Sequence, residues 1–287
     1  MRVGFLGLGH MGEPMATRLV GHGVDLTVWN RSAPASERVA AIGARVAASP
    51  AEVFETCDAV LLMLANGPVT DAVLGRHDDG SAVPVRGRVV VNMGTVAPSY
   101  SLGLGAWVVG RGGQFVEAPV SGSKGPALAG QLVTMLAGES AAIDRVEGLF
   151  AAFSASVVRC GAQPLALETK LAVNTYLIAM VTGLAEAFAF AERRGVDGDL
   201  VRRILDAGPM ASTVSRGKLA KLVDGDLAAQ AAVSDVRYNS RLILDAAGEV
   251  GAAVPLVAAC EALLAESEAL GLGASDMVAV VNALRAR

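Results

Sequence analysis

Short apolar runs alternate with amphipathic stretches along the first part of the chain, and this order predicts a mostly parallel, doubly wound sheet. Continuous apolar runs such as residues 59–64 are typical of strands covered on both faces. The strand-like runs are residues 2–6, 25–29, 45–46, 59–64, 88–93, 114–118, 131–137 and 156–159. The helical stretches are residues 11–19, 34–42, 68–74, 98–111 and 139–153, with a further helix starting after Ser49. Residues 75–86 and 119–130 are predicted to be loops.

The pattern changes near residue 164, after which only helical spacing continues. Helices are predicted over residues 164–194, 198–207, 212–223, 234–250, 254–270 and 276–287. We therefore expect an α/β domain over residues 1–162, followed by an all-α domain over residues 163–287 that begins with a long interdomain helix.

Three glycines after the first strand-like run, Gly7, Gly9 and Gly12, form the pattern G-x-G-x-x-G. The pattern is weak alone, but here a strand precedes it, and a helix and a second strand follow within about 30 residues. Gly7 would allow a tight turn, Gly9 would let a pyrophosphate approach the backbone, and Gly12 would let the helix pack on the strand. The phosphates would bind N–H groups at the helix N-terminus. The context predicts a Rossmann-type dinucleotide-binding domain; a glycine turn without a ligand is the alternative.

The amino-acid composition indicates which classes of binding partner are not expected. The 287 residues are 53% apolar and 18% charged, with a net charge of −4 and no basic block, so nucleic acid is not expected to bind. Three cysteines and three histidines are scattered, which predicts neither a metal site nor disulfides and favours a reducing cytoplasm.

No targeting or membrane segment is expected. The N-terminus has a strand-like run where a signal peptide would have a charged and then apolar segment. Residues 171–191 are long enough to cross a bilayer. They include Asn174, Glu186 and threonines and start beside Lys170, which favours a buried helix of a soluble protein.

The end of the second strand indicates which nucleotide binds. NAD-preferring sites usually have a carboxylate there for the ribose 2′-hydroxyl, whereas this chain has Asn30 followed by Arg31 and Ser32. Arg31 could pair with a 2′-phosphate, so we expect NADP(H) and regard NAD(H), with a solvated Arg31, as the weaker alternative. The other residues expected at the cofactor are Leu8, His10 and Met11 in the glycine loop and Leu64, Ala65, Asn66 and Thr95 at two further strand ends.

Two stretches are candidates for the chemistry. The loop after residue 118 offers hydroxyls and free N–H groups, which suit a small carboxylate; an ordinary glycine-rich turn is the alternative. Lys170 and Asn174, four residues apart, lie on one face of the long helix. Burial would lower the pKa of Lys170 toward that of a general acid, whereas a lysine that reaches water from the helix end would have no such role.

These motifs, in this order along essentially the whole chain, resemble the β-hydroxyacid dehydrogenases, the family of 3-hydroxyisobutyrate dehydrogenase. The motifs are the glycine loop, the Ala118–Gly122 segment and the stretch from Gly161 through Lys170 to Asn174. Residues 30–32 and 121–127 look most like the NADPH-dependent glyoxylate/succinic semialdehyde reductase branch.

The resemblance implies roles for individual residues. Lys170 would be the general acid/base, Asn174 would support it or the substrate oxygen, and Thr95 would lie near the nicotinamide. It also implies a homodimer or homotetramer. The implied substrate residues are Ser121, Gly122, Ser123, Lys124 and Asp235.

Two departures from the family pattern concern the substrate pocket. Family members usually have Lys-Asp at the start of a late helix, where this chain has Ser234-Asp235. A preceding segment that often contains a bulky group is alanine-rich here, at residues 227–232. The first change predicts a different cofactor affinity or substrate choice, and the second predicts a more open or more apolar pocket wall.

The expected activity is hydride transfer between NADPH and a small aldehyde-acid or keto-acid, or the reverse reaction on the 3-hydroxyacid. An imine reductase is a second class, although those relatives generally replace the lysine that Lys170 represents. A non-catalytic NADP-binding interaction module on the same fold is the third, because fold alone does not determine function.

Overall fold

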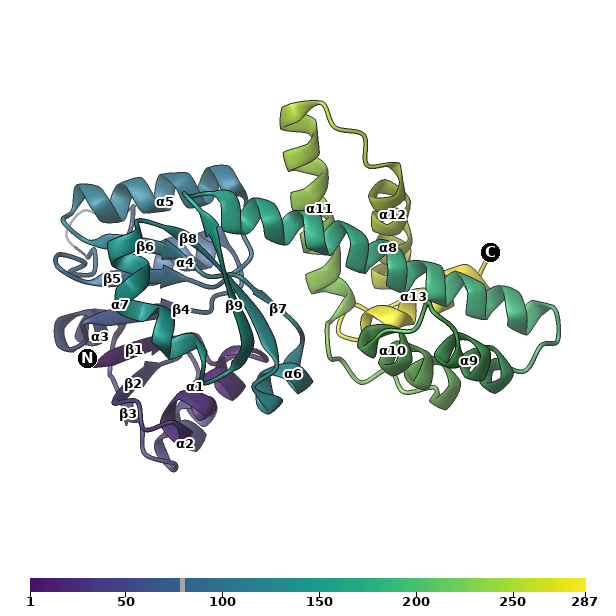
Figure 1. The fold of residues 1–287 in the computed structure, drawn as a ribbon, viewed down its shortest axis with the longest axis horizontal. Coiled ribbons are helices and arrows are strands. Elements are labelled where there is room, and N and C mark those ends of the chain that lie inside the picture. Colours follow the sequence, from purple (N-terminus) through teal and green to yellow (C-terminus); the bar gives the residue numbers. More distant parts are fainter. Residues whose placement is uncertain (78–80) are drawn as a thin grey trace. The chain divides into compact units, whose positions relative to one another are not determined.

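The computed structural model describes residues 1–77 and 81–287, and the chain divides into two compact units, residues 1–170 and 171–287 (Figure 1). Residues 78–80, within the predicted loop 75–86, lie outside the described residues. The two units meet inside one long helix, which confirms the expected interdomain helix. The boundary predicted after residue 162 falls just before this helix.

The first unit contains a mixed sheet with the strand order β3-β2-β1-β4-β5-β6-β8-β7, and β9 pairs with β8. Strands β1 to β6 are parallel to their neighbours along this order, whereas β8 runs antiparallel to β6 and β7. The strands are β1 (Val3–Leu6), β2 (Leu26–Trp29), β3 (Arg45–Val46), β4 (Ala59–Leu62), β5 (Val89–Asn92), β6 (Gln114–Glu117), β7 (Val120–Ser121), β8 (Leu132–Gly138) and β9 (Ser154–Gly161).

Helices cover both faces of this sheet, as the doubly wound pattern predicts. In β4, Leu61 belongs to the core under α1, α2 and α7, and the adjacent Leu62 belongs to the core under α3, α4 and α5. Alternate strand residues therefore fill opposite cores because successive side chains point to opposite faces. The helices are α1 (Gly12–Gly21), α2 (Ala33–Ala40), α3 (Pro50–Thr56), α4 (Gly67–Leu74), α5 (Pro98–Gly110), α6 (Lys124–Ala129) and α7 (Ser140–Phe150).

The prediction of a loop over residues 119–130 was wrong. The segment forms the short strand β7, which pairs with β8, and then the six-residue helix α6. Pro126 is tolerated in the first turn of α6, and Gly130, with φ +71°, ends the helix in the left-handed conformation. Elements this short leave no periodic pattern, so the glycines, prolines and serines dominated the prediction.

The second unit is helical, as expected. Its last predicted helix, residues 276–287, starts instead as a 3₁₀ turn, because the Asp276 carboxylate accepts a hydrogen bond from Val278 N. The helices are α8 (Leu165–Arg193), whose first turns belong to the first unit, α9 (Gly198–Ala207), α10 (Thr213–Asp224), α11 (Val233–Val250), α12 (Pro255–Ala269), η1 (Met277–Ala279) and α13 (Val280–Arg285).

One helix among the described residues, α8, is long and apolar enough to cross a membrane, with a mean hydropathy of 1.5 over its most apolar window. Of this window, 39% is buried within the protein. Length and composition do not separate a membrane span from a core helix, so the assignment of α8 to a protein interior stays a prediction.

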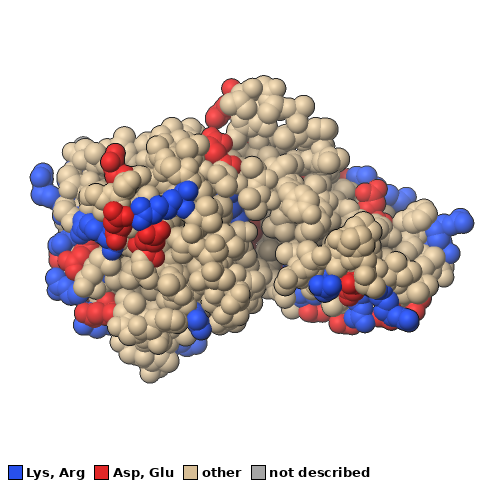
Figure 2. Space-filling model, viewed as in Figure 1, with Lys and Arg blue, Asp and Glu red and all other residues tan. Residues whose placement is uncertain are grey.

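The second unit exposes many large apolar side chains. In the view of Figure 2, much of its surface is uncharged, and the charged side chains gather mainly along its edges. No residue of α9 is buried. The most exposed of these side chains are Tyr176, Phe190, Ile204, Met210, Val250 and Leu256.

Candidate functional site

The carboxyl ends of five parallel strands lie in register at one edge of the sheet. Leu6 pairs with Trp29 and Leu62, and Asn92 pairs with Leu62 and Glu117. The residues that follow these strands therefore meet at this edge, where ligands of open α/β sheets bind. The predicted cofactor residues come from the segments directly after β1, β2, β4 and β5, namely residues 7–12, 30–32, 64–66 and 95.

The glycine loop has the geometry that the motif predicts. Gly7 has φ +95°, and a Cβ there would lie 2.3 Å from Met63 O. A Cβ on Gly12 would lie 1.9 Å from Gly7 O, so the helix start packs against the turn. A Cβ on Gly9 would meet nothing within 4 Å. The loop thus leaves open space at the glycine where a dinucleotide pyrophosphate would approach, and the residues present fit that group.

Asn30 connects the glycine loop to the start of α2. Its Oδ1 accepts a hydrogen bond from Leu8 N at 2.9 Å, and its Nδ2 donates to Ser32 O and Ser32 Oγ at 3.0 Å each. The side chain therefore shapes the loop from within. Arg31 is exposed and, within the described chain, forms no hydrogen bond or ion pair. Its guanidinium is available to a phosphate next to Ser32.

The residues after β4 and β5 contribute differently. Asn66 caps α4 by accepting a hydrogen bond from Val69 N at 3.0 Å, so its carbonyl oxygen is used in the fold. Leu64 is half-buried and Ala65 is exposed. Thr95 is half-buried, and its hydroxyl has no hydrogen-bond partner in the part of the chain that the structure describes. Of these four, Thr95 is therefore the one whose polar side chain makes no hydrogen bond among the described residues.

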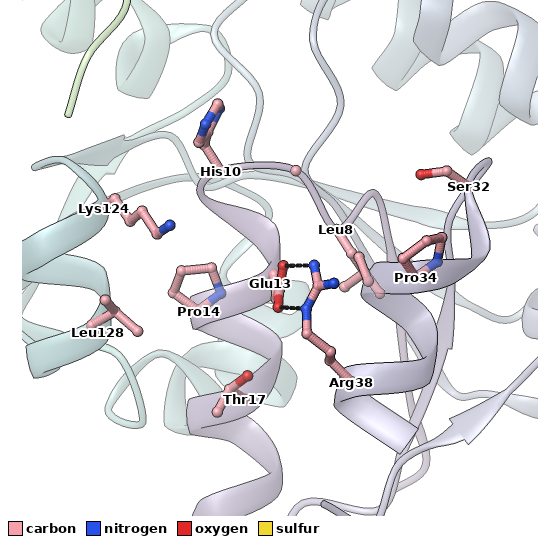
Figure 3. A pocket seen from close by; sticks show the side chains of 12 residues that line it. Leu8, His10, Glu13, Pro14, Thr17, Ser32, Pro34, Arg38, Lys124 and Leu128 are labelled. Atoms are coloured by element: carbon pink, nitrogen blue, oxygen red, sulfur yellow. Dashed lines mark hydrogen bonds and ion pairs between the residues drawn. The ribbon is translucent and has the colours of Figure 1, made fainter. Parts of the chain in front are cut away.

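A pocket of about 700 Å³ lies beside the glycine loop (Figure 3). His10 lines it from the glycine loop, Glu13 from the start of α1, Arg38 from α2 and Lys124 from α6. Glu13 and Arg38 form a two-bond ion pair at 2.6 and 2.8 Å, which holds the pKa of Glu13 below its ordinary value. The structure thus places Lys124, predicted for the substrate, in a pocket with glycine-loop residues.

The sequence analysis missed Glu13 and Arg38. Their signal was weak, because ion pairs on the outer faces of amphipathic helices are common. Only the contact between α1 and α2 shows that these two residues occupy the same pocket.

The predicted carboxylate-binding segment is a strand end followed by a helix start. Ser121 is the last residue of β7 and is half-buried. Gly122 has φ +130°, and a Cβ there would lie 2.5 Å from Leu132 Cδ2. Ser123 stands at the N-cap of α6, but its side chain makes no capping hydrogen bond. The Ser123 hydroxyl and the uncapped N–H groups of the first turn are therefore possible hydrogen-bond donors.

Glu117 is a buried carboxylate that the sequence analysis did not select. It is fully buried at the end of β6, and it accepts hydrogen bonds from Ser101 Oγ at 2.5 Å and from Leu167 N at 3.3 Å. Burial raises the pKa of Glu117. The carboxylate satisfies an N–H group in the first turn of α8 and thereby attaches this helix to the sheet. An acidic residue in a buried strand was the available signal.

Lys170 lies in the second turn of α8 and is 7% exposed. Its ammonium group makes no hydrogen bond or ion pair within residues 1–77 and 81–287. Burial lowers the pKa of Lys170 to about 8, as desolvation predicts. The alternative of a lysine reaching water from the helix end is therefore wrong for this side chain.

One turn further along α8, Asn174 is 5% exposed. Its Nδ2 donates to Asn239 Oδ1 on α11 at 3.2 Å, whereas its Oδ1 has no partner among the described residues. Asp235 and Ser234 are exposed at the start of α11. Of the predicted residues, Asn174 and Asp235 thus belong to the second unit, and Ser121 to the first.

Comparisons with known proteins cover nearly the whole chain. Residues 2–161 match the family model of the NAD binding domain of 6-phosphogluconate dehydrogenase, and residues 166–284 match that of the NAD-binding region of NADP-dependent 3-hydroxyisobutyrate dehydrogenase. Glyoxylate/succinic semialdehyde reductase 1 of Arabidopsis thaliana is 32% identical, over 99% of this chain and 99% of that protein. The chloroplastic reductase 2 of the same plant is 30% identical, over 99% of this chain and 79% of that protein.

A solved structure of similar fold is 3-hydroxyisobutyrate dehydrogenase from Salmonella typhimurium, with a TM-score of 0.89 and 24% identity over 98% of this chain and 99% of that one. The two family models and the curated relatives agree with the motifs and with the sheet edge described above. The chain therefore belongs to the β-hydroxyacid dehydrogenase family of NAD(P)-binding oxidoreductases, whose members act on CH–OH groups.

Proposed function

We propose that this protein is an NADPH-dependent reductase of a small aldehyde-acid or keto-acid, and that the reverse reaction oxidises the corresponding 3-hydroxyacid. The observation that carries this proposal is Lys170, a buried lysine near the start of the long helix with no acceptor among the described residues and with a pKa of about 8. Such a group can donate and accept a proton near neutral pH. Bound NADPH would supply the hydride.

Lys170 acts as the general acid in the reductive direction. Its ammonium group stabilises the negative charge that develops on the carbonyl oxygen and then donates a proton to it. Burial strengthens this interaction, because little water is present to screen the charge. In the oxidative direction, neutral Lys170 removes the hydroxyl proton. Asn174, one turn later on the same helix, supports the ammonium or the substrate oxygen.

The preference for NADPH rests on the end of β2. The chain has no carboxylate at residue 30, and the free guanidinium of Arg31 stands between Asn30 and Ser32. An arginine can form two parallel hydrogen bonds with a phosphate. We therefore expect the ribose 2′-phosphate to bind at Arg31 and Ser32.

The carboxylate of the substrate would bind at Ser121 and Gly122, where a hydroxyl and backbone N–H groups are exposed together. The two plant relatives are named as reductases of glyoxylate and succinic semialdehyde, which supports a small aldehyde-acid. Ser234 and the alanines of residues 227–232 have smaller side chains than the family usually has there, so we expect a more open or more apolar pocket wall. We expect substrates with a larger or more apolar substituent than glyoxylate.

Turnover against a substrate panel tests this function. The consumption of NADPH, followed by the absorbance of reduced nicotinamide, is measured with small aldehyde-acids, keto-acids and cyclic imines, and NADH is run in parallel. Turnover of an acid with NADPH supports the proposal. Turnover of imines alone would indicate the second enzyme class. NADPH binding without consumption of any compound would indicate a non-catalytic module.

We also propose that the enzyme assembles from copies of this chain through its helical unit. Large apolar side chains of α8 and α9, such as Tyr176, Phe190 and Ile204, are exposed. Monomeric proteins rarely expose wide apolar patches of this kind. No residue of α9 is fully buried, and its side chains Leu200 and Ile204 are exposed. Light scattering after size-exclusion chromatography gives the mass directly, and a monomer would contradict the proposal.

A further inference from the structure

The buried amide of Asn174 has one satisfied end and one open end. Its Nδ2 donates to Asn239 Oδ1 at 3.2 Å, and its Oδ1 has no hydrogen-bond partner among the described residues. The side chain is 5% exposed. A buried acceptor without a partner destabilises a fold because its desolvation is not compensated, and most buried polar atoms are paired. The open end therefore needs a donor that the helical unit itself does not supply.

Asn239 determines which end of Asn174 stays open. Asn239 Nδ2 donates to Asp235 O, one turn earlier in α11, at 2.7 Å. A backbone carbonyl only accepts hydrogen bonds, so Asn239 must direct its NH₂ group toward Asp235 O and its Oδ1 toward Asn174. Asn174 must then direct its own NH₂ group toward Asn239. A flip of either amide would place two oxygens or two NH₂ groups together.

We propose that Asn239 is a positioning residue, which orients the Asn174 amide so that its carbonyl oxygen, and not its NH₂ group, is presented to the reacting groups. This inference rests on the proposed function. The donor that fits the open oxygen is an ammonium or hydroxyl group, and Lys170 lies one turn earlier on α8. Asn174 then acts as an acceptor that holds the proton-donating group in place.

If Asn239 is a positioning residue, it affects turnover only by orienting the Asn174 amide. Asn239→Leu keeps a side chain of similar size but removes both the NH₂ group and the oxygen of the amide. Asn174 can then rotate, and its NH₂ group would compete with Lys170 for the substrate oxygen. We expect kcat to fall about tenfold, with KM for NADPH unchanged. Asn239→Asp keeps an acceptor for Asn174 Nδ2, so it should keep more activity than Asn239→Leu.

A double-mutant cycle separates positioning from a general structural effect. In an Asn174→Ala background, Asn239→Leu should cause no further loss of kcat, because the group that it orients is absent. An equal loss in both backgrounds, or an unchanged kcat in the single variant, would overturn the proposal. Asn282→Leu is the matched control, because Asn282 is also half-buried on a helix of this unit and donates to a nearby backbone carbonyl, Ala279 O.

A readout that needs no turnover keeps this test apart from the proposed function. The chain has six asparagines, so ¹⁵N-asparagine labelling gives six side-chain NH₂ signals. Exchange of the Asn174 NH₂ protons with solvent should be slow in the full-length wild type and faster in Asn239→Leu. Unchanged exchange would contradict the hydrogen-bond chain, whatever the panel shows. If the wild type turned over no compound of the substrate panel but the exchange result were as expected, only the proposed function would be contradicted.

Discussion

Lys170 on α8 and Lys218 on α10 are buried to the same degree, at 7% and 6% exposure, but only one has a carboxylate partner. Lys218 Nζ lies 2.7 and 2.9 Å from the two carboxylate oxygens of the fully buried Asp276. Burial lowers the pKa of Lys218, and Asp276 opposes that shift. For Lys170, burial acts without opposition.

The difference shows that the partner, and not burial alone, separates a structural lysine from a catalytic candidate. Asp276 also accepts hydrogen bonds from Gln230 N, Ala231 N and Val278 N, so the pair holds the segment before α11 against η1. An ammonium held in such a network is not available to bind a substrate. Within the part of the chain that the structure describes, the Lys170 ammonium has no such network, which leaves it available to a substrate oxygen.

The largest expected effect is on turnover in Lys170→Met. The substitution preserves the length of the side chain and removes the proton donor, so kcat should fall about 10²–10⁴-fold. NADPH binding, measured by fluorescence titration, should stay within about twofold of the wild type, because no cofactor contact is assigned to this side chain. Full activity of the variant would exclude Lys170 as the acid.

Substitution of Lys218 and substitution of Lys170 should change the free energy of unfolding in opposite directions. Lys218→Met leaves the Asp276 carboxylate buried without a cation, so the free energy of unfolding in urea should fall by about 3–5 kcal/mol. Lys221→Met is the matched control: Lys221 is equally buried, but the side chain of its partner Asp226 is 50% exposed, so the loss should be smaller.

Lys170→Met should instead stabilise the fold at neutral pH, by at most about 3 kcal/mol. The folded pKa of about 8 lies below the ordinary 10.5, so the unfolded chain holds this proton more tightly. The destabilisation by Lys170 is therefore complete below pH 8 and disappears as the pH rises toward 10.5. A variant less stable than the wild type would mean that Lys170 has a structural partner.

The same contrast between a free cation and a paired cation can be tested on cofactor binding with two arginines. Arg31→Ala should raise KM for NADPH about 10–100-fold and leave KM for NADH nearly unchanged, because it removes a cation expected at the 2′-phosphate. Arg45→Ala is the control, since that exposed guanidinium is paired with Asp25 and does not line the pocket beside the glycine loop. Equal losses for both cofactors in Arg31→Ala would remove the argument for NADPH.

The smallest effect is the pH dependence of the wild type. Reduction needs protonated Lys170, so kcat/KM should be level below pH 8 and fall about tenfold for each pH unit above it. Oxidation of the hydroxyacid needs the neutral amine and should rise over the same range. These profiles should be absent from any residual activity of Lys170→Met.

Much of the fold could be predicted because its signals are local. The strand runs, the glycine spacing and the change to helical periodicity near residue 164 gave the doubly wound sheet and the helical unit. The loop prediction for residues 119–130 failed, since β7 and α6 are too short for periodicity. The antiparallel pairing of β8 was not predicted either, because the direction of pairing depends on which strand lies alongside.

The candidate site was predicted only in part. The glycine loop, Arg31, Ser121 and Lys170 each stand in a motif or at a strand end, so the sequence indicated them. Asn239 and Glu117 were missed, because the role of each depends on contact with another element: Asn239 with Asn174, and Glu117 with the first turn of α8.

The sequence by itself determined the order of elements, the nucleotide-binding loop and the position of a lysine on the long helix, since these depend on spacing along the chain. Tertiary structure alone decided which polar groups are buried and which have partners. The paired groups are far apart in sequence, 58 residues for Lys218 and Asp276 and 65 for Asn174 and Asn239. Burial and pairing arise from packing between elements, and spacing along the chain does not record them.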